Sequence, residues 1–84
     1  MNNKHRKTLY KIFSDPINGN LPWNDIETLL VAIGCNVVEG SGSSVTFEKH
    51  GRRAYFHRPH PQHEALIYRV KVAREFLIKL EITP

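Results

Sequence analysis

Residues 40–63 read GSGSSVTFEKHGRRAYFHRPHPQH, and this stretch decides the fold. Val45 and Phe47 alternate with polar residues before the turn sequence KHGR, and Ala54 and Phe56 alternate with polar residues after it. Apolar residues at every second position are typical of a strand with one buried face. The stretch therefore predicts an antiparallel hairpin whose apolar face rests on the rest of the chain.

The turn sequence also predicts the register of this hairpin. A turn around residues 49–52 places Ser44 opposite His57 and Thr46 opposite Tyr55. A slip by one residue would pair inward residues with outward ones, and burial of one sheet face opposes that slip. We therefore expect Ser44, Tyr55 and His57 to lie together on the open face of the sheet.

Apolar residues at helical spacing flank the hairpin on both sides. The patterns predict helices over residues 4–13, 22–33 and 66–80 and a further strand over 35–39. In the last helix the apolar stripe consists of Leu66, Val70, Ala73, Leu77 and Leu80. Helices on one face of three sequential strands predict an α+β fold, a two-layer α-β-β-β-α sandwich with an extra N-terminal helix.

The length and composition bound the organisation of the chain. With 84 residues it is predicted to form a single domain over residues 1–84, with a core over 22–82 and an accessory helix over 4–13. One cysteine, Cys35, excludes an internal disulfide, fits a reducing cytosol and is expected in the core. The sequence has no apolar run of about 18 residues, so we expect a soluble cytoplasmic protein without a membrane partner.

Charge is distributed unevenly along the chain. The formal net charge is +4, and residues 49–63 contain four Lys or Arg side chains and four histidines but no acid. We therefore expect the positive field to lie on the hairpin, which permits a polyanionic partner. The basic residues of the 4–13 helix are interpreted as a solvated face, with a phosphate-contacting or partner-binding arm as the alternative.

The histidines after the hairpin could suggest a metal site. His57, His60 and His63 are spaced by three residues, which brings ligands together on a helix. Pro59 and Pro61 exclude a helix there, because proline cannot donate to the helical ladder. The spacing therefore does not favour metal binding.

A ribonuclease that needs no metal could use the same surface. A histidine can take a proton from a ribose 2′-hydroxyl, and a nearby arginine can stabilise the charge that develops on the phosphate. His57 lies in sequence near Arg53, Tyr55 and Arg58, which supply such groups. The alternative interpretation is an ordinary surface histidine on a solvated strand.

Several short segments, in this order and spacing, resemble one known family. They are LPWND at 21–25, Leu29-Leu30, Gly34, Glu39-Gly40 with the glycine-serine turn, Val45-x-Phe47, Gly51-Arg52-Arg53, RPHP at 58–61 and REFL at 74–77. Together they resemble the HicA toxins of bacterial toxin-antitoxin systems, over most of the chain from about residue 20. Residues 4–13 resemble the extra N-terminal helix of one HicA branch.

The resemblance implies a fold, an activity and partners. The fold would be of the double-stranded-RNA-binding type. The activity would be that of an mRNA interferase, an endoribonuclease that cleaves mRNA without a metal or another cofactor and so inhibits translation and growth. The partners would be mRNA and a HicB-type antitoxin that covers the active face, in the bacterial cytoplasm, with no small-molecule cofactor and no membrane.

The resemblance also points to a site on the hairpin. In the family, the residue just before the apolar alternation of the second strand is often the catalytic histidine; here it is Ser44, which cannot titrate near neutral pH. We hypothesise that His57, across the ladder, has taken the role of base on the patch that Ser44 shares. The expected RNA-binding residues are Lys49, Arg52, Arg53, Tyr55, Arg58 and His60. The alternative is an inactive RNA-binding or antitoxin-binding module of the same fold.

Overall fold

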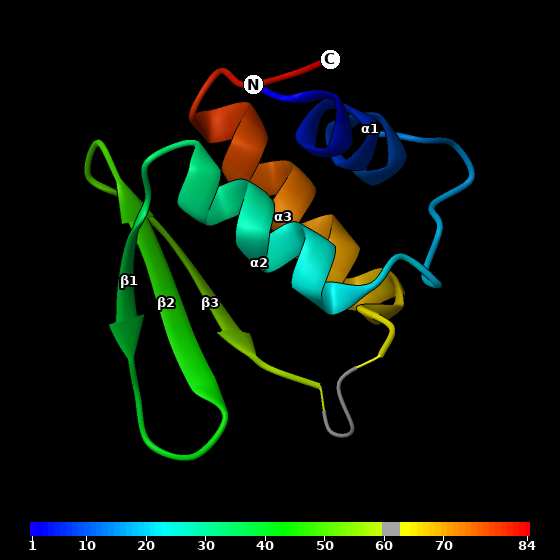
Figure 1. The fold of residues 1–84 in the computed structure, drawn as a ribbon. Helices are drawn as coiled ribbons and strands as arrows, with labels where there is room; N and C mark the ends of the chain where they lie inside the picture. Colours follow the sequence, from blue (N-terminus) through cyan, green and yellow to red (C-terminus); the bar gives the residue numbers. More distant parts are fainter. Residues whose placement is uncertain (60–62) are drawn as a thin grey trace.

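The computed structural model describes residues 1–59 and 63–84 and contains three helices and one three-stranded sheet. The elements follow in the order α1 (Asn3–Ile12), α2 (Trp23–Ala32), β1 (Asn36–Glu39), β2 (Ser44–Lys49), β3 (Arg52–His57) and α3 (Leu66–Lys79). Figure 1 shows α2 and α3 on the same side of the sheet. The predicted α+β order is confirmed, while its assignment to the double-stranded-RNA-binding type stays a prediction.

The sheet is antiparallel with the strand order β1-β2-β3. Ser44 pairs with His57 and Thr46 with Tyr55, so the predicted hairpin register is confirmed. His50 and Gly51 connect β2 to β3 with φ values of 52° and 75°. Two successive residues with positive φ match the right-handed twist of the strands, and they make the short turn tight enough to hold this register.

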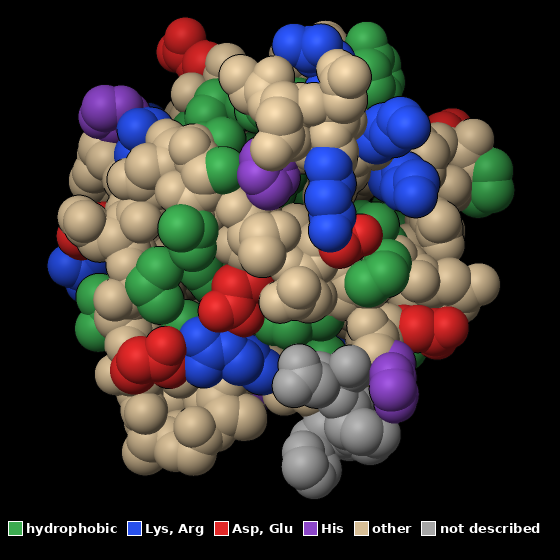
Figure 2. Space-filling model, in the orientation of Figure 1, with side chains coloured by type: hydrophobic (Ala, Val, Ile, Leu, Met, Phe, Trp, Pro, Cys, Tyr) green, Lys and Arg blue, Asp and Glu red, His purple; other side chains and the backbone are tan. Residues whose placement is uncertain are grey.

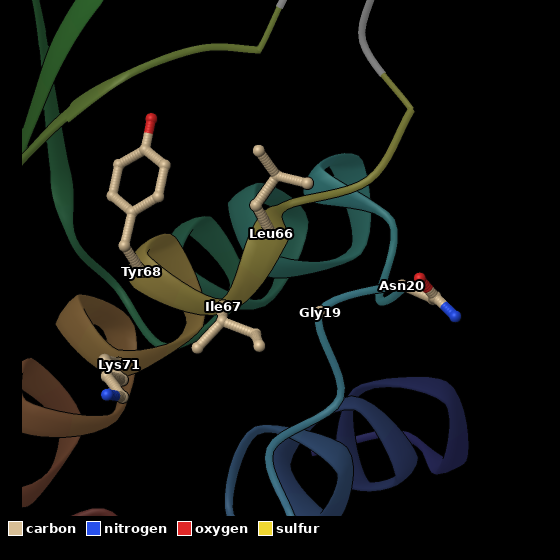
Figure 3. A pocket seen from close by; sticks show the side chains of 6 residues that line it. All are labelled: Gly19, Asn20, Leu66, Ile67, Tyr68 and Lys71. Atoms are coloured by element: carbon tan, nitrogen blue, oxygen red, sulfur yellow. The ribbon is translucent and has the colours of Figure 1, made fainter.

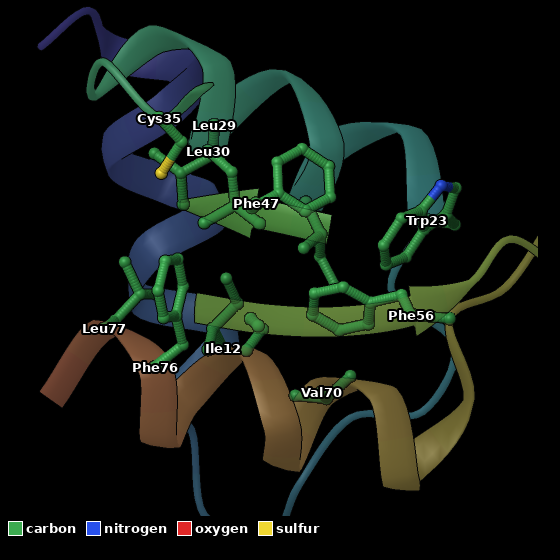
Figure 4. Close-up of a cluster of buried hydrophobic side chains, with 14 of the residues drawn as sticks. Ile12, Trp23, Leu29, Leu30, Cys35, Phe47, Phe56, Val70, Phe76 and Leu77 are labelled. Carbon is green, nitrogen blue, oxygen red and sulfur yellow. The ribbon is translucent and has the colours of Figure 1, made fainter. Parts of the chain in front are cut away.

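Aromatic side chains form the centre of the core between the helices and the sheet (Figure 4). Trp23 of α2 and Phe56 of β3 have ring centroids 4.9 Å apart, and Phe47 lies 5.9 Å from Phe56. Trp23 is 1% exposed and its indole donates to Glu27 Oε1 at 2.9 Å. Cys35 is buried as expected, and burial raises the pKa of its thiol.

The beginning of α3 differs from the prediction. Leu66 was placed on the buried stripe, but it is 47% exposed and has a φ of 69°. Its backbone N–H donates to Gly19 O at 2.9 Å, and the N–H of Ala65 donates to Leu21 O at 2.8 Å. These bonds fix the entry to α3 against the segment before α2, so Ala65 is buried and Leu66 is turned outward.

Arg69 is a buried charged residue of α3, although it lies off the apolar stripe. It is 7% exposed, and its guanidinium donates to His57 O at 2.7 Å and to Ala65 O at 3.2 Å. A buried arginine is tolerated where its donors have acceptors. Arg69 therefore joins the last residue of β3 to the first turn of α3.

The accessory helix α1 packs against both α2 and α3. Leu9 and Ile12 belong to the common core, at 5% and 0% exposed. Arg74 of α3 donates to Ile12 O at 2.9 Å and to Ser14 O at 2.8 Å, which satisfies carbonyls at the end of α1. α1 is therefore fixed to the body of the protein.

Replacing Arg74 should loosen α1. We expect Arg74→Met to lower the free energy of unfolding by about 1–3 kcal/mol, because two carbonyl groups lose a charged donor. Urea denaturation would measure the loss, and hydrogen exchange would locate it in α1. Arg53→Gln is the control: it removes only a surface ion pair with Glu48 and should cost about 0.5 kcal/mol or less. Equal losses in both variants would contradict this role of Arg74.

Candidate functional site

An exposed histidine held by two hydroxyl groups lies at the end of β3. The Tyr55 hydroxyl lies 3.2 Å from His57 Nε2, and Ser43 Oγ lies 3.3 Å from His57 Nδ1. The Tyr55 and His57 rings meet edge to face, with centroids 5.3 Å apart at 83°. We call Ser43, Tyr55 and His57 the histidine patch. Tyr55 is 57% exposed, so the patch is open to a ligand.

The two hydroxyls can bond to either neutral tautomer of His57. A neutral imidazole has one N–H donor and one acceptor nitrogen, so one hydroxyl donates to the ring and the other accepts from it. The ring is thereby held in one orientation at the surface. An oriented neutral imidazole can accept a proton from a bound hydroxyl group, which is the requirement for a general base.

Ser43 was not anticipated from the sequence. It lies in the turn before β2, and its carbonyl accepts a hydrogen bond from the N–H of Arg58 at 2.9 Å. This bond extends the ladder by one residue beyond the Ser44 and His57 pair and brings the Ser43 hydroxyl beside the imidazole. The signal was available in the register, because Ser43 directly precedes the residue paired with His57.

Ser44 faces His57 across the ladder as predicted, but its expected place on the open patch was wrong. It is 6% exposed, and its hydroxyl donates to Ser41 O at 2.7 Å. A Cβ atom at position 40 would collide with the Ser44 hydroxyl, so Gly40 is required for this close approach. The turn covers Ser44, and the hydroxyl that reaches His57 is that of Ser43.

Arg58 follows the histidine patch and is held by two carboxylates. Its guanidinium donates to both oxygens of Glu27, at 3.0 and 2.9 Å, and to both oxygens of Glu39, at 2.7 and 2.9 Å. The hydrogen bond with Arg58 lowers the pKa of Glu39, and the two carboxylates raise the pKa of Arg58. Arg58 was expected to contact RNA phosphates, but in the structure its guanidinium donates to the carboxylates of Glu27 and Glu39.

The other basic residues of the hairpin do not form one patch with His57. Arg53 pairs with Glu48 at 2.9 Å on the open face. Lys49 and Arg52 lie opposite each other in the strand register, at the turn end of the hairpin. This end is about 17 Å along the strand from His57. The positive field expected on the hairpin is therefore reduced, because acids fold beside Arg53 and Arg58. His60 lies outside the described residues.

Within residues 1–59 and 63–84, no group of three or more His, Cys, Asp or Glu side chains is arranged to hold a metal ion. The spacing of His57, His60 and His63 is not tested by this observation, because His60 is outside the described range. The same described part of the chain has no helix both long and apolar enough to cross a membrane.

Apart from the histidine patch, a hollow lies at the beginning of α3, with a volume of about 540 Å³ (Figure 3). Its lining consists of Gly19, Asn20, Leu66, Ile67, Tyr68 and Lys71. Arg69 stacks on the Tyr68 ring at 4.6 Å. Among the described residues the lining is largely apolar and includes no histidine or carboxylate, so the histidine patch is the better candidate for acid-base chemistry.

A family model described as "HicA toxin of bacterial toxin-antitoxin" matches residues 23–76. The chain belongs to the HicA toxin family. The match begins with α2 and includes all three strands and most of α3, whereas α1 lies outside it. The HicA family places this protein among the toxins of toxin-antitoxin systems. No curated protein and no solved structure matches the chain.

The ion pairs between Arg58 and the two glutamates should make the free energy of unfolding depend on pH. The pKa of Glu39 is below its ordinary value of 4.5, so the stabilisation is fully present above that pH and is lost as the pH falls through the lowered pKa. We expect Arg58→Met to destabilise the protein at neutral pH, and the difference from wild type to shrink below pH 4.5. Urea denaturation at several pH values measures this, and a difference that grows toward acid would contradict it.

Proposed function

We propose that this HicA toxin is a metal-independent endoribonuclease that cleaves mRNA in the bacterial cytoplasm, with His57 as its general base. One observation carries the proposal: the exposed His57 ring has a hydroxyl at each nitrogen, Ser43 at 3.3 Å and Tyr55 at 3.2 Å. A histidine that is oriented yet accessible has the protonation chemistry that RNA cleavage at neutral pH requires. Cleavage of mRNA would inhibit translation and growth.

The reaction would be an internal transesterification. His57 would take the proton of a ribose 2′-hydroxyl at Nδ1, where that hydroxyl replaces the hydroxyl of Ser43, and the oxygen would attack the adjacent phosphorus. The bond to the 5′-oxygen of the next nucleotide breaks, which leaves a 2′,3′-cyclic phosphate. The leaving oxygen receives a proton from the Tyr55 hydroxyl, and the imidazolium of His57 returns its proton to Tyr55. Arg53 lies four residues before His57 on β3, about 13 Å along the strand, so it would contact a neighbouring phosphate of the same RNA and not the reacting one.

Ser44 would contribute through the shape of the turn. Its hydroxyl donates to Ser41 O at 2.7 Å, and this bond closes the turn that presents Ser43 to His57. Ser44 would thus act as a positioning residue. Tyr55 and Arg53 would contact RNA directly, and Lys49 and Arg52 would contact it farther along the hairpin.

The open face of the sheet also suits a protein partner. Val38 and Tyr55 are 54% and 57% exposed, and Thr46 pairs with both of them, so the three side chains form one row across the sheet. Exposed apolar side chains next to polar ones are common where two proteins bind. We propose that a HicB-type antitoxin covers this row and thereby blocks the histidine patch.

A second candidate function is a non-catalytic RNA-binding or antitoxin-binding module. The observation that favours it is the residue at the family's usual position for the catalytic histidine. That residue is Ser44, 6% exposed, and its hydroxyl is bonded within the turn. In this case the open face would bind RNA or antitoxin without cleaving RNA.

Replacement of His57 tests the proposal. We expect His57→Ala to reduce cleavage of a labelled RNA in EDTA by about 10²–10⁴-fold, the usual contribution of a general base, and to abolish growth arrest. Tyr55→Phe keeps the ring, loses the hydroxyl and should give a smaller loss. His50→Asn is the matched control, because His50 is a turn residue with a φ of 52° that asparagine tolerates.

The outcomes separate the two candidates. Full activity in His57→Ala would show that His57 is not the base. RNA binding by the wild type without any cleavage in EDTA would support the non-catalytic module. Relief of growth arrest by the product of the neighbouring gene would identify the antitoxin, and loss of that relief after Val38→Lys would place it on the open face.

A further inference from the structure

The net positive charge of the chain comes from the helix α1. It contains Lys4, Arg6, Lys7 and Lys11 and no acid. The whole chain has twelve Lys and Arg against eight Asp and Glu, so the part outside α1 has eight of each. The formal net charge of +4 therefore equals the charge of this one helix. Figure 2 shows Lys and Arg side chains gathered over the position of α1.

Three of these cations, Arg6, Lys7 and Lys11, lie on the side of α1 that faces away from the body of the protein. Thr8, Leu9 and Ile12 form the buried side of α1, at 3%, 5% and 0% exposed. The helical period places Lys7 and Lys11 on the side away from these residues. The two lysines are one turn apart, and both are exposed. Arg6 and Tyr10 lie on the same side, and Tyr10 is 59% exposed. We call Arg6, Lys7, Tyr10 and Lys11 the basic face of α1.

The charges of α1 are unfavourable for an isolated helix. Basic residues in the first turn oppose the helix dipole, and the first turn of α1 has no acid, whereas Lys11 in the last turn is favourable for the dipole. Lys7 and Lys11 are like charges at i, i+4, which repel each other on a helix. Lys4 has a partner in Asp25 at 3.8 Å, but it is not part of the basic face. A sequence that breaks local rules on one exposed face points to a role in binding.

We propose that the basic face of α1 binds the phosphate backbone of RNA at a second site, separate from the histidine patch. Three cations and an exposed tyrosine on a fixed helix match a polyanion with aromatic bases. A lipid surface is less suitable, because the apolar side of α1 is used in the core and has nothing to insert. The RNA identity rests on the proposed function.

Because of the position of α1, the second site should affect the binding of long RNA and of short RNA differently. In Figure 1, α1 lies beyond α2 and α3 from the sheet. The protein measures 32 × 29 × 20 Å, so a single strand of RNA must run around its side to reach both sites. The basic face would therefore raise the affinity for long RNA and would add little for a fragment that fills only the histidine patch.

The test compares two matched pairs of lysines. Lys7→Gln/Lys11→Gln removes two charges from the basic face, and Lys71→Gln/Lys79→Gln removes two exposed charges from α3. Both are made in the full chain with His57→Ala, so that the probe, a fluorescent single-stranded RNA, stays intact and binding is measured independently of cleavage. Circular dichroism would verify that both variants are folded.

We expect the α1 variant to bind the RNA about 10–30-fold more weakly near 0.1 M salt, with a salt slope shallower by about 1.4, as two lost phosphate contacts predict. The α3 variant should stay within about twofold of the parent. Equal weakening in both variants would overturn the proposal, because only net charge would then matter. Unchanged RNA binding in the α1 variant would overturn it as well.

Two further outcomes would assign the basic face to another partner and so overturn the proposal. One is binding to phosphatidylglycerol vesicles that depends on Lys7 and Lys11 while RNA binding does not. The other is the same dependence for the antitoxin. Wild-type protein that binds RNA through α1 but does not cleave it would refute the proposed nuclease activity and leave this inference standing.

Discussion

The Arg58 guanidinium joins three elements that are distant in the sequence. It follows β3, and its donors reach Glu27 in α2 and Glu39 at the end of β1. Glu27 in turn accepts from the indole of Trp23, whose ring packs on Phe56. The ion pairs at the surface and the aromatic core are therefore parts of one connected arrangement. Planar, bidentate contacts of this kind fix orientation as well as distance.

The histidine patch depends on this arrangement. The turn that carries Ser43 begins directly after Glu39, and the N–H of Arg58 bonds to the Ser43 carbonyl. Arg58 thus holds the turn and the end of β3 together with both its side chain and its backbone. From the other side, Arg69 donates to the carbonyl of His57. The backbone of His57 is fixed from two directions while its ring stays exposed.

The sequence predicted the parts of the fold that local rules determine. The hairpin register followed from alternation and turn chemistry, and the element order followed from periodicity. The sequence could not show that Leu66 turns outward or that Arg58 is paired with Glu27, because each depends on contacts between distant residues. The expected positive field on the hairpin was overestimated for the same reason, because Glu27 and Glu39 from other elements lie beside Arg58. The burial of Ser44 depends on the exact conformation of the neighbouring turn, which the glycine-serine composition of that turn does not determine.

The tight turn at Gly40 also limits how this toxin can change by mutation. There is no room for a Cβ atom at position 40, and the Ser44 side chain fills the space under the turn. A larger residue at position 44 would have to open the turn, and it would displace Ser43 from His57. Any acid-base residue at position 44 therefore requires a concerted change of the loop.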